Sequence, residues 1–428
     1  MVFAILGILF FLLIFGIPIG FAIGLTSIYA LYEAGPAFLA MVPQRMFGGL
    51  DSFTFLAIPF FFLAGELMNK AKITEELMDF AFVLLGRLRG GLAYANILAS
   101  LIFAGITGAA LADVAALGSI EIPIMKEAGY DEEFAAAITV ASSIIGPIIP
   151  PSLIMVIYGS IMQVSIAALF VAGIIPGILL ALILSAMTYY YSSKRNYPIK
   201  EVEFSLKEVF NSFIKAFLAL LMPFILIGGI LTGIFTATEA ASVAAGYAFI
   251  IGFFVKRTLK LRDLPEMFKK VAINTSVIFL ILGTASIFTW ALGFHRIPAQ
   301  IANMIINLTD NVYLILLFLN IFLLIVGMLI DVGAALIMLA PILAPVAIEF
   351  GVHPLHFGII MSINLMIGLS TPPVGPCLFA VVAITDDLTL EDISKAIIPF
   401  IFGMFILILI ITYIPQIVMF LPRLLGYV

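Results

Sequence analysis

Two short stretches of this chain carry nearly the same pattern of isoleucine, glycine and proline. Residues 145–151 read Ile-Gly-Pro-Ile-Ile-Pro-Pro, and residues 367–373 read Ile-Gly-Leu-Ser-Thr-Pro-Pro. Both lie in strongly apolar sequence, where a cluster of Gly and Pro interrupts a helix. Interrupted membrane helices at matching places in two halves are typical of secondary transporters and indicate where they bind substrate. The same offset of 222 positions aligns Gly105 with Gly327, Pro123 with Pro345 and Gly129 with Gly351.

The apolar character of the whole chain limits the classes of protein it can belong to. Hydrophobic residues make up 64% of the 428 residues and charged residues 11%, with a mean hydropathy of +1.26. Soluble domains carry about 25% charged residues. Apolar runs longer than about 18 residues recur from end to end, so we predict an all-α polytopic membrane protein. The predicted spans cover 3–31, 52–69, 131–162, 165–192, 212–234, 236–255, 271–292, 354–384 and 396–421.

Two further apolar stretches, 91–125 and 312–349, are too long for one span and are interrupted midway. The interruptions are Gly105 to Asp113 and Gly327 to Gly333. We interpret each stretch as a re-entrant helical hairpin that enters and leaves the membrane on the same side. Just before each hairpin, residues 73–86 and 297–308 have apolar residues at helical spacing, which predicts amphipathic helices along the membrane surface. These helices either hold the hairpins mechanically or are ordinary surface helices.

The basic residues support this topology. With both hairpins re-entrant, 17 of the 20 Lys and Arg residues fall on one side of the membrane, and only Arg45, Arg296 and Arg423 fall on the other. The positive-inside rule then predicts a cytoplasmic N-terminus and an outer C-terminus. The 17 residues are Lys70, Lys72, Arg87, Arg89, Lys126, Lys194, Arg195, Lys200, Lys207, Lys215, Lys256, Arg257, Lys260, Arg262, Lys269, Lys270 and Lys395.

This topology gives the two halves opposite orientations. Residues 1–192 form the first inverted repeat, 193–235 a cytoplasmic loop with a connecting span, and 236–428 the second inverted repeat. Each repeat contains one hairpin and one discontinuous helix, 131–162 or 354–384. Inverted repeats with discontinuous helices that meet near the bilayer midplane are a transporter architecture. Thr236 and Glu239, between two spans, have the spacing of a capping box, and we assign them that structural role.

The interruptions free backbone groups that can bind ions. Freed carbonyls suit a small cation such as Na⁺, and freed N–H groups at the start of a half-helix attract anions. The paired prolines, Pro150-Pro151 and Pro372-Pro373, fit the opening of such half-helices, since proline in the first turn gives up no hydrogen bond. Polar residues cluster around both interruptions. They are Thr107, Asp113, Ser142, Ser143 and Ser152 in the first half, and Asp331, Asn364, Ser370 and Thr371 in the second.

Each of these polar residues also has a structural interpretation. Asp113 and Asp331 are candidate cation ligands, because a carboxylate at membrane depth is costly, but each could instead make a structural hydrogen bond. Ser142 and Ser143 are further candidates, although serines in membrane helices often bond their own backbone. We assign Ser152, Asn364 and the four prolines to substrate binding.

Other chemistries lack sequence support. No phosphate-binding loop, metal-enzyme cluster or lipase motif is present, and no extended basic patch suggests nucleic acid. The single Cys377 excludes an intramolecular disulfide framework. A passive channel would show a polar stripe along several helices, and an intramembrane enzyme would need a nucleophile near Asp113 or Asp331.

The motifs resemble the large membrane subunit of TRAP (tripartite ATP-independent periplasmic) transporters over nearly the whole chain. The resemblance rests on residues 105–113, 129–131, 145–152, 228–239 and 368–375. Two departures are visible: residues 105–108 read Gly-Ile-Thr-Gly where serine-rich tips are common, and Ala237 stands where proline is common. Thr107 still offers a hydroxyl group, so neither departure argues against the resemblance to this family.

The resemblance implies Na⁺-driven uptake of a small carboxylate across the bacterial inner membrane by an elevator-like movement. The substrate would be a sialic acid, a C4-dicarboxylate or a related organic acid. The implied partners, besides membrane lipid, are a periplasmic binding protein and a small four-helix membrane subunit, which we expect to be a separate chain. A stand-alone divalent-anion/Na⁺ symporter remains the alternative. The implied cation sites are Thr107–Gly108 with Ser142, Ser143, Gly146 and Pro147, and Gly327–Asp331 with Ser370, Thr371 and Gly375.

Overall fold

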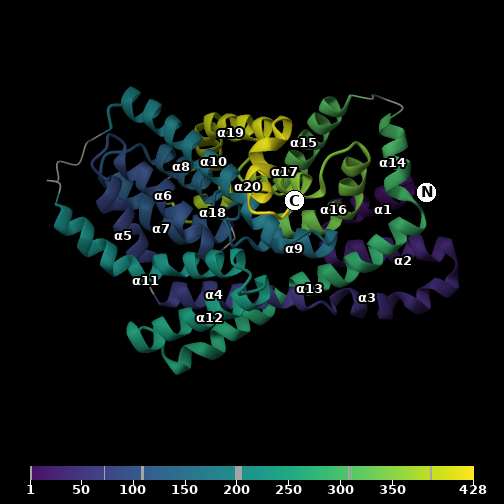
Figure 1. The fold of residues 1–428 in the computed structure, drawn as a ribbon. Helices are drawn as coiled ribbons and strands as arrows, with labels where there is room; N and C mark the ends of the chain where they lie inside the picture. The colour runs from purple at the N-terminus through teal and green to yellow at the C-terminus, as the bar shows by residue number, and fades with distance from the viewer. Residues whose placement is uncertain are drawn as a thin grey trace.

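All regular secondary structure in the described part of the chain is helical (Figure 1). The computed structural model describes residues 2–71, 73–107, 110–197, 205–306, 309, 311–385 and 388–428. Within these residues, eight helices are long and apolar enough to cross a membrane. The prediction of an all-α polytopic membrane protein is therefore confirmed.

The first half of the chain contains ten α-helices and two short 3₁₀ helices. They are α1 (Val2–Ile14), α2 (Ile19–Ala34), η1 (Pro36–Met41), α3 (Val42–Leu50), η2 (Phe53–Leu56), α4 (Ala57–Lys70), α5 (Ile73–Leu85), α6 (Gly91–Thr107), α7 (Ala110–Glu127), α8 (Glu132–Ser143), α9 (Leu153–Met162) and α10 (Ile166–Lys194).

The rest of the chain begins with the long helix α11. Its elements are α11 (Leu206–Leu231), α12 (Ala237–Ile250), η3 (Ile251–Val255), η4 (Leu261–Asp263), α13 (Leu264–Phe294), α14 (Ile297–Ile306), α15 (Val312–Leu329), α16 (Val332–Glu349), α17 (Pro354–Gly368), α18 (Pro376–Val382), α19 (Leu390–Tyr413) and α20 (Pro415–Leu424).

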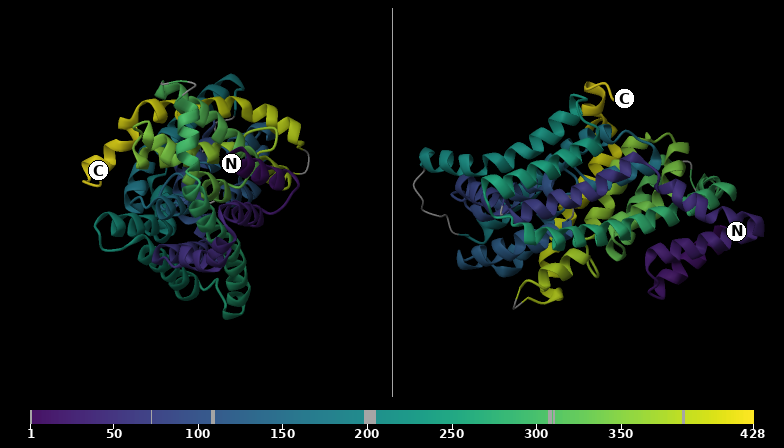
Figure 2. Two further views of the ribbon diagram at one scale, coloured as in Figure 1. Left: turned by 90° about the vertical axis from the view of Figure 1, so that its right-hand side faces the viewer. Right: turned by 90° about the horizontal axis from the view of Figure 1, so that it is seen from below.

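Two predicted spans are each divided in the structure. The stretch 3–31 forms α1 and α2, because Gly16 has a φ of +77° and Pro18 precedes the second helix. The stretch 396–421 forms α19 and α20, which begins at Pro415. Proline cannot donate the hydrogen bond that would continue either helix. The amino-terminal pair lies at one end of the molecule, with α2 against α13 (Figure 2).

Both predicted hairpins are pairs of adjacent helices, α6 with α7 and α15 with α16. The predicted extents of the tips were too wide. Gly105 lies within α6 and Gly327 within α15, and the second turn consists of Ile330 and Asp331 only. Residues 108 and 109 of the first turn lie outside the described residues. The predicted amphipathic segments are the helices α5 and α14.

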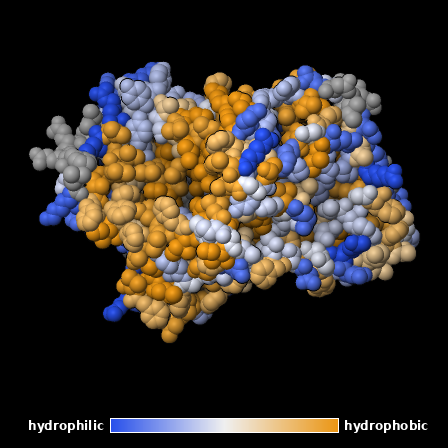
Figure 3. Space-filling view, in the orientation of Figure 1, coloured by the Kyte–Doolittle hydropathy of each residue, from blue (hydrophilic) through white to orange (hydrophobic). Residues whose placement is uncertain are grey.

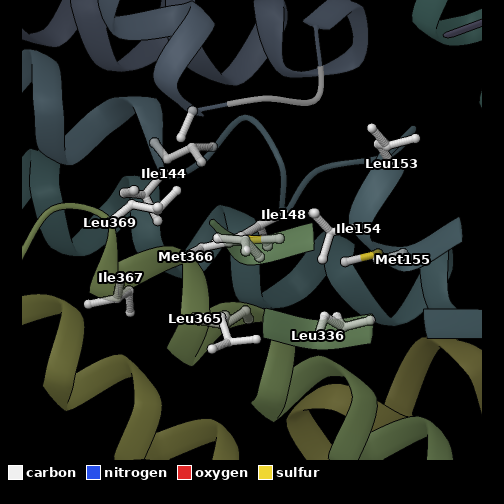
Figure 4. Packing of buried hydrophobic residues seen from close by; sticks show 14 of the residues in the cluster. Ile144, Ile148, Leu153, Ile154, Met155, Leu336, Leu365, Met366, Ile367 and Leu369 are labelled. Carbon is white, nitrogen blue, oxygen red and sulfur yellow. The ribbon is translucent and has the colours of Figure 1, made fainter. Parts of the chain in front are cut away.

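The two predicted discontinuous helices are interrupted as expected. Residues 144–152 separate α8 from α9, and residues 369–375 separate α17 from α18. We call these the first break and the second break. The two breaks pack against one another. Ile144 and Ile148 of the first break lie in one buried apolar cluster with Leu369 of the second break and with Met366 and Ile367 at the end of α17 (Figure 4).

A close glycine contact fixes the second broken helix against the second hairpin. A Cβ atom on Gly368 would lie 2.5 Å from the carbonyl carbon of Gly327, and one on Gly327 would lie 2.5 Å from the carbonyl oxygen of Leu365. Helices in membranes approach this closely only where both carry small residues. The contact therefore sets the position of the second break relative to α15.

The outer surface is strongly apolar over α11 and α12 (Figure 3). On α11 this surface is formed by the exposed side chains of Phe210, Ile214, Phe217 and Phe224, which are between 46% and 71% exposed. Such a face is the expected covering of a protein surrounded by lipid tails.

The capping box at the start of α12 is present as predicted. Thr236 Oγ1 accepts a hydrogen bond from the backbone N–H of Glu239, and the Glu239 carboxylate accepts one from the backbone N–H of Thr236. We expect Thr236→Ala to lower the free energy of unfolding by about 1 kcal/mol, measured by thermal unfolding in detergent. Ser242→Ala is the control, because Ser242 bonds only the carbonyl of Glu239 in its own helix; an equal loss in both variants would contradict the capping role.

Candidate functional site

A cavity of about 310 Å³ lies where the two hairpins and the two breaks meet. Helices α4 and α13 close another side of it, through Phe62 and Ile278. The described lining is apolar apart from Asp331, and it contains no Lys, Arg or His. The remaining lining includes Ala110, Leu111, Pro147, Leu153, Val332, Gly333, Leu369 and Pro376.

Four helices begin at this cavity. The residues that start α7, α9, α16 and α18 all line it, and they are Ala110, Leu153, Val332 and Pro376. The first N–H groups of a helix have no partner within the helix, and its dipole places partial positive charge there. The helix dipoles therefore place partial positive charge beside the cavity although no basic side chain lines it, and part of this charge is already capped by Asp331 in α16 and by Ser152 in α9.

A buried carboxyl group of α7 lies against the first break. Asp113, in the first turn of α7, is 0% exposed. A Cβ atom added to Gly146 would lie 2.3 Å from Asp113 Oδ2 and 3.2 Å from the backbone oxygen of Ser143. Glycine at position 146 thus leaves room for a carboxylate oxygen and a backbone carbonyl to converge, which is the kind of oxygen environment that a small cation prefers.

The second break brings backbone carbonyls together around Gly375. Gly375 has a φ of +44°, and a Cβ atom there would lie 2.8 Å from the backbone oxygen of Thr371 and 3.0 Å from that of Leu369. A side chain at this position would therefore crowd both carbonyl groups. The oxygen of Leu369 also accepts a hydrogen bond from the N–H of Cys377 at 3.0 Å.

Asp331 forms the tip of the second hairpin and caps α16. Its Oδ1 accepts hydrogen bonds from the N–H groups of Gly333 at 2.9 Å and Ala334 at 3.3 Å. The cap uses only Oδ1 in the described hydrogen bonds, and the residue lines the cavity. The structural and the ligand interpretations of Asp331 are therefore compatible.

Cys377, at the start of α18, connects the two carboxyl groups in space. Its thiol lies near Ser143 and near both Asp113 and Asp331. One acid from each half of the chain therefore lies near Cys377, and of these two acids Asp331 lines the cavity.

Comparison with known proteins assigns the chain to a family. The family described as "Tripartite ATP-independent periplasmic transporter, DctM component" matches residues 6–417. The chain is a TRAP transporter large permease. It is accordingly a multi-pass membrane transporter subunit and not an enzyme.

Individual relatives agree with this assignment. The permease is 41% identical to the sialic acid TRAP transporter large permease protein SiaM of Vibrio cholerae, over 97% of each chain. It is 38% identical to the C4-dicarboxylate TRAP transporter large permease protein DctM of Pseudomonas aeruginosa, over 95% of this chain and 94% of the relative. The solved YdaH transporter of Alcanivorax borkumensis shares the fold, with a TM-score of 0.61 at 13% identity over 88% of this chain and 87% of that one.

The paired prolines of the permease, Pro150-Pro151 and Pro372-Pro373, lie before the half-helices and not in their first turns. Helix α9 begins after Pro150-Pro151, with Ser152 as its N-cap, and α18 begins at Pro376, with Gly375 before it. The Ser152 hydroxyl donates to the carbonyl of Pro147 and accepts from the N–H of Met155 at 3.3 Å. The sequence analysis assigned Ser152 to substrate binding. In the structure the residue has a structural role, because both hydrogen bonds of its hydroxyl group shape the first break.

Several other predicted site residues bond within the protein. Ser143 donates to Val140, and both Ser370 and Thr371 donate to the carbonyl of Ile367 at 2.8 Å. Asn364 is fully buried and donates to Asn320 at 3.0 Å, and it is not among the residues that line the cavity. Gly108 and the side chain of Thr107 lie outside the described residues.

The sequence analysis missed a buried polar network behind the first break of the permease. Asn96 of α6 donates to the Glu121 carboxyl group and, at 2.7 Å, to Thr139. Ser142 donates to Asn96 Oδ1 at 2.6 Å and accepts from Ser100 at 3.0 Å. All five side chains are at most 1% exposed. A polar residue on each of three apolar helices was the available signal, but the sequence does not show which helix faces meet.

Proposed function

We propose that this permease imports a small carboxylate across the bacterial inner membrane by coupling its movement to Na⁺. The observation that supports it is the charge of the cavity. An anion that enters the cavity meets Asp331, while Asp113 lies against Gly146, next to the cavity-lining Pro147, and the described lining offers no basic side chain. At an effective dielectric constant of 20, two like charges 6 Å apart repel by about 3 kcal/mol.

Cations bound at the breaks would remove this repulsion. The carboxyl group of Asp113 with the carbonyl of Ser143, and the carbonyls around Gly375 with Asp331, provide oxygen atoms for them. A repulsion of about 3 kcal/mol corresponds to roughly a hundredfold in affinity. Substrate binding would therefore depend on bound Na⁺, and the helix N-termini at the cavity would hold the carboxylate.

The remaining parts of the proposal concern movement and partners. The hairpins and broken helices would form the moving unit, and α5 and α14 would connect it to the remaining helices. The N-terminus would be cytoplasmic and the C-terminus periplasmic, as the distribution of 17 of the 20 basic residues favours. The substrate would be a sialic acid, a C4-dicarboxylate or a related acid, delivered by a periplasmic binding protein, with a small membrane subunit beside this chain.

Uptake into proteoliposomes tests this function. The vesicles contain the permease with its cognate small subunit, and the binding protein is added outside with a labelled sialic acid or C4-dicarboxylate. We expect replacement of external Na⁺ by K⁺ to reduce the initial rate of uptake at least tenfold, because without bound Na⁺ the negative charge at the cavity repels the substrate. Omission of the binding protein is the control.

The outcomes separate the two candidate functions. Uptake that requires both Na⁺ and the binding protein supports the tripartite symporter. Uptake that requires Na⁺ but proceeds at an unchanged rate without the binding protein favours a stand-alone symporter. Equal uptake in Na⁺ and K⁺ would contradict the coupling mechanism.

A further inference from the structure

Glu121 is a buried acid that the transport site described above does not use. It lies in α7, eight residues after Asp113 and therefore about 12 Å further along the helix. Its side chain is 0% exposed. Its Oε2 accepts a hydrogen bond from Asn96, whereas its Oε1 has no hydrogen-bonding partner among the described residues.

Among the described residues, no positively charged group is seen in contact with Glu121. On its own helix the charged groups are Asp113, Lys126 and Glu127, and Lys126 is paired with Glu132 of α8. The titratable groups on the helices packed against α7 are Tyr94 of α6, Glu132 and Glu133 of α8, and Cys377 of α18. Among the described contacts of Glu121, none is an ion pair.

An ionised carboxylate in this position would be an isolated buried charge, which is far more costly than a buried neutral polar group. Something must neutralise it. A metal ion is a poor candidate, because Na⁺ needs several oxygen ligands and the described hydrogen-bonding partner of the carboxyl group is the NH₂ group of Asn96, a donor. Thr139 Oγ1 and Ser142 Oγ already take part in hydrogen bonds with Asn96 and with backbone carbonyls.

We propose that Glu121 is a proton-binding site, so that the permease carries a bound proton inside its membrane-embedded helices. The proton sits on the carboxyl group and leaves Oε2 to accept the hydrogen bond from Asn96. Asn96 in turn accepts from Ser142, so this amide connects the carboxyl group to the end of α8, next to the first break. The site lies beyond the transport cavity, since neither Glu121 nor Asn96 lines it.

Glu121→Gln is the decisive variant, because it keeps the shape of the neutral acid without a titratable proton. The purified wild type and variant are unfolded in weakly buffered solution near pH 7, and the released protons are counted with an indicator dye. Unfolding exposes Glu121 to water, where its carboxyl group ionises at this pH. We expect the wild type to release about one proton per chain more than the variant.

The matched control is Glu133→Gln, an exposed acid at the start of α8. It should release the same number of protons as the wild type. Should Glu121→Gln fail to yield folded protein, Glu121→Met serves instead, since methionine is unbranched and apolar. The infrared carbonyl band of a protonated carboxylic acid gives a second readout, present in the wild type and weaker in either Glu121 variant.

Equal proton release from the wild type and the Glu121 variant, together with an unchanged carboxylic acid band, would overturn the proposal. Neither readout involves uptake of any substrate. Failure of the proton site and failure of the proposed Na⁺-coupled transport are therefore distinguishable.

Discussion

Replacing Gly368 with alanine is expected to destabilise the permease by about 3 kcal/mol and to abolish most of its uptake. The added Cβ would lie 2.5 Å from the carbonyl carbon and 2.6 Å from the Cα of Gly327. Both atoms belong to the backbone, so no side-chain rotation relieves the clash, and α15 and α17 must separate. Overpacking of this kind costs about 1–3 kcal/mol or more, which exceeds the gain of about 1 kcal/mol in helix propensity from Gly to Ala.

The measurements are the yield of folded protein, its thermal unfolding in detergent and uptake into vesicles. Gly246→Ala is the matched control, because Gly246 lies within α12 and has no atom within 4 Å of its would-be Cβ. That variant should be as stable as the wild type or slightly more stable. Gly327→Ala should behave like Gly368→Ala, since its Cβ would meet the backbone of Leu365. If both Gly368→Ala and Gly327→Ala were as stable as the wild type, α15 and α17 would be able to separate without loss of stability, and the prediction would be wrong.

The prolines and glycines made the helix boundaries predictable. Proline lacks the N–H group that a helix needs, so Pro150-Pro151 and Pro372-Pro373 indicated both breaks, although each half-helix begins a few residues later than expected. The same signal was present at Pro18 and Pro415, where the prediction ran one span through two helices. Long apolar runs concealed these interruptions, because hydropathy measures composition and not helix continuity.

The contacts across helices were not predictable. The offset of 222 positions aligned Gly327 with Gly105 and Gly368 with Gly146, but nothing in the sequence indicated that Gly327 and Gly368 touch. Likewise, Asn96 and Glu121 are 25 residues apart on different helices. Their meeting depends on how each helix is rotated, and an apolar membrane helix shows little periodicity to reveal that rotation. Individual acids could be proposed as ligands from the sequence, whereas their hydrogen bonds required the structure.

Asp331 allows its two roles, helix cap and cation ligand, to be separated by a pair of substitutions. Asparagine caps a helix as well as aspartate does, and alanine does not. Asp331→Asn should therefore keep the bonds to the N–H groups of Gly333 and Ala334 and leave stability within about 0.5 kcal/mol of the wild type. It removes the negative charge, so we expect the Na⁺ concentration for half-maximal uptake to rise tenfold or more, equivalent to about 1.4 kcal/mol.

Asp331→Ala should lose both functions, with a further decrease of about 1 kcal/mol in the free energy of unfolding. Asp392→Asn is the control for charge, since Asp392 belongs to the capping box of α19, whose N-cap is Thr389, and does not line the cavity. Stability thus reports on the capping hydrogen bonds of Asp331, and Na⁺ dependence reports on its negative charge. If Asp331→Asn keeps the wild-type Na⁺ dependence while Asp331→Ala is only less stable, Asp331 acts as a cap alone, and Na⁺ coupling must then depend on Asp113 and the carbonyls of the breaks.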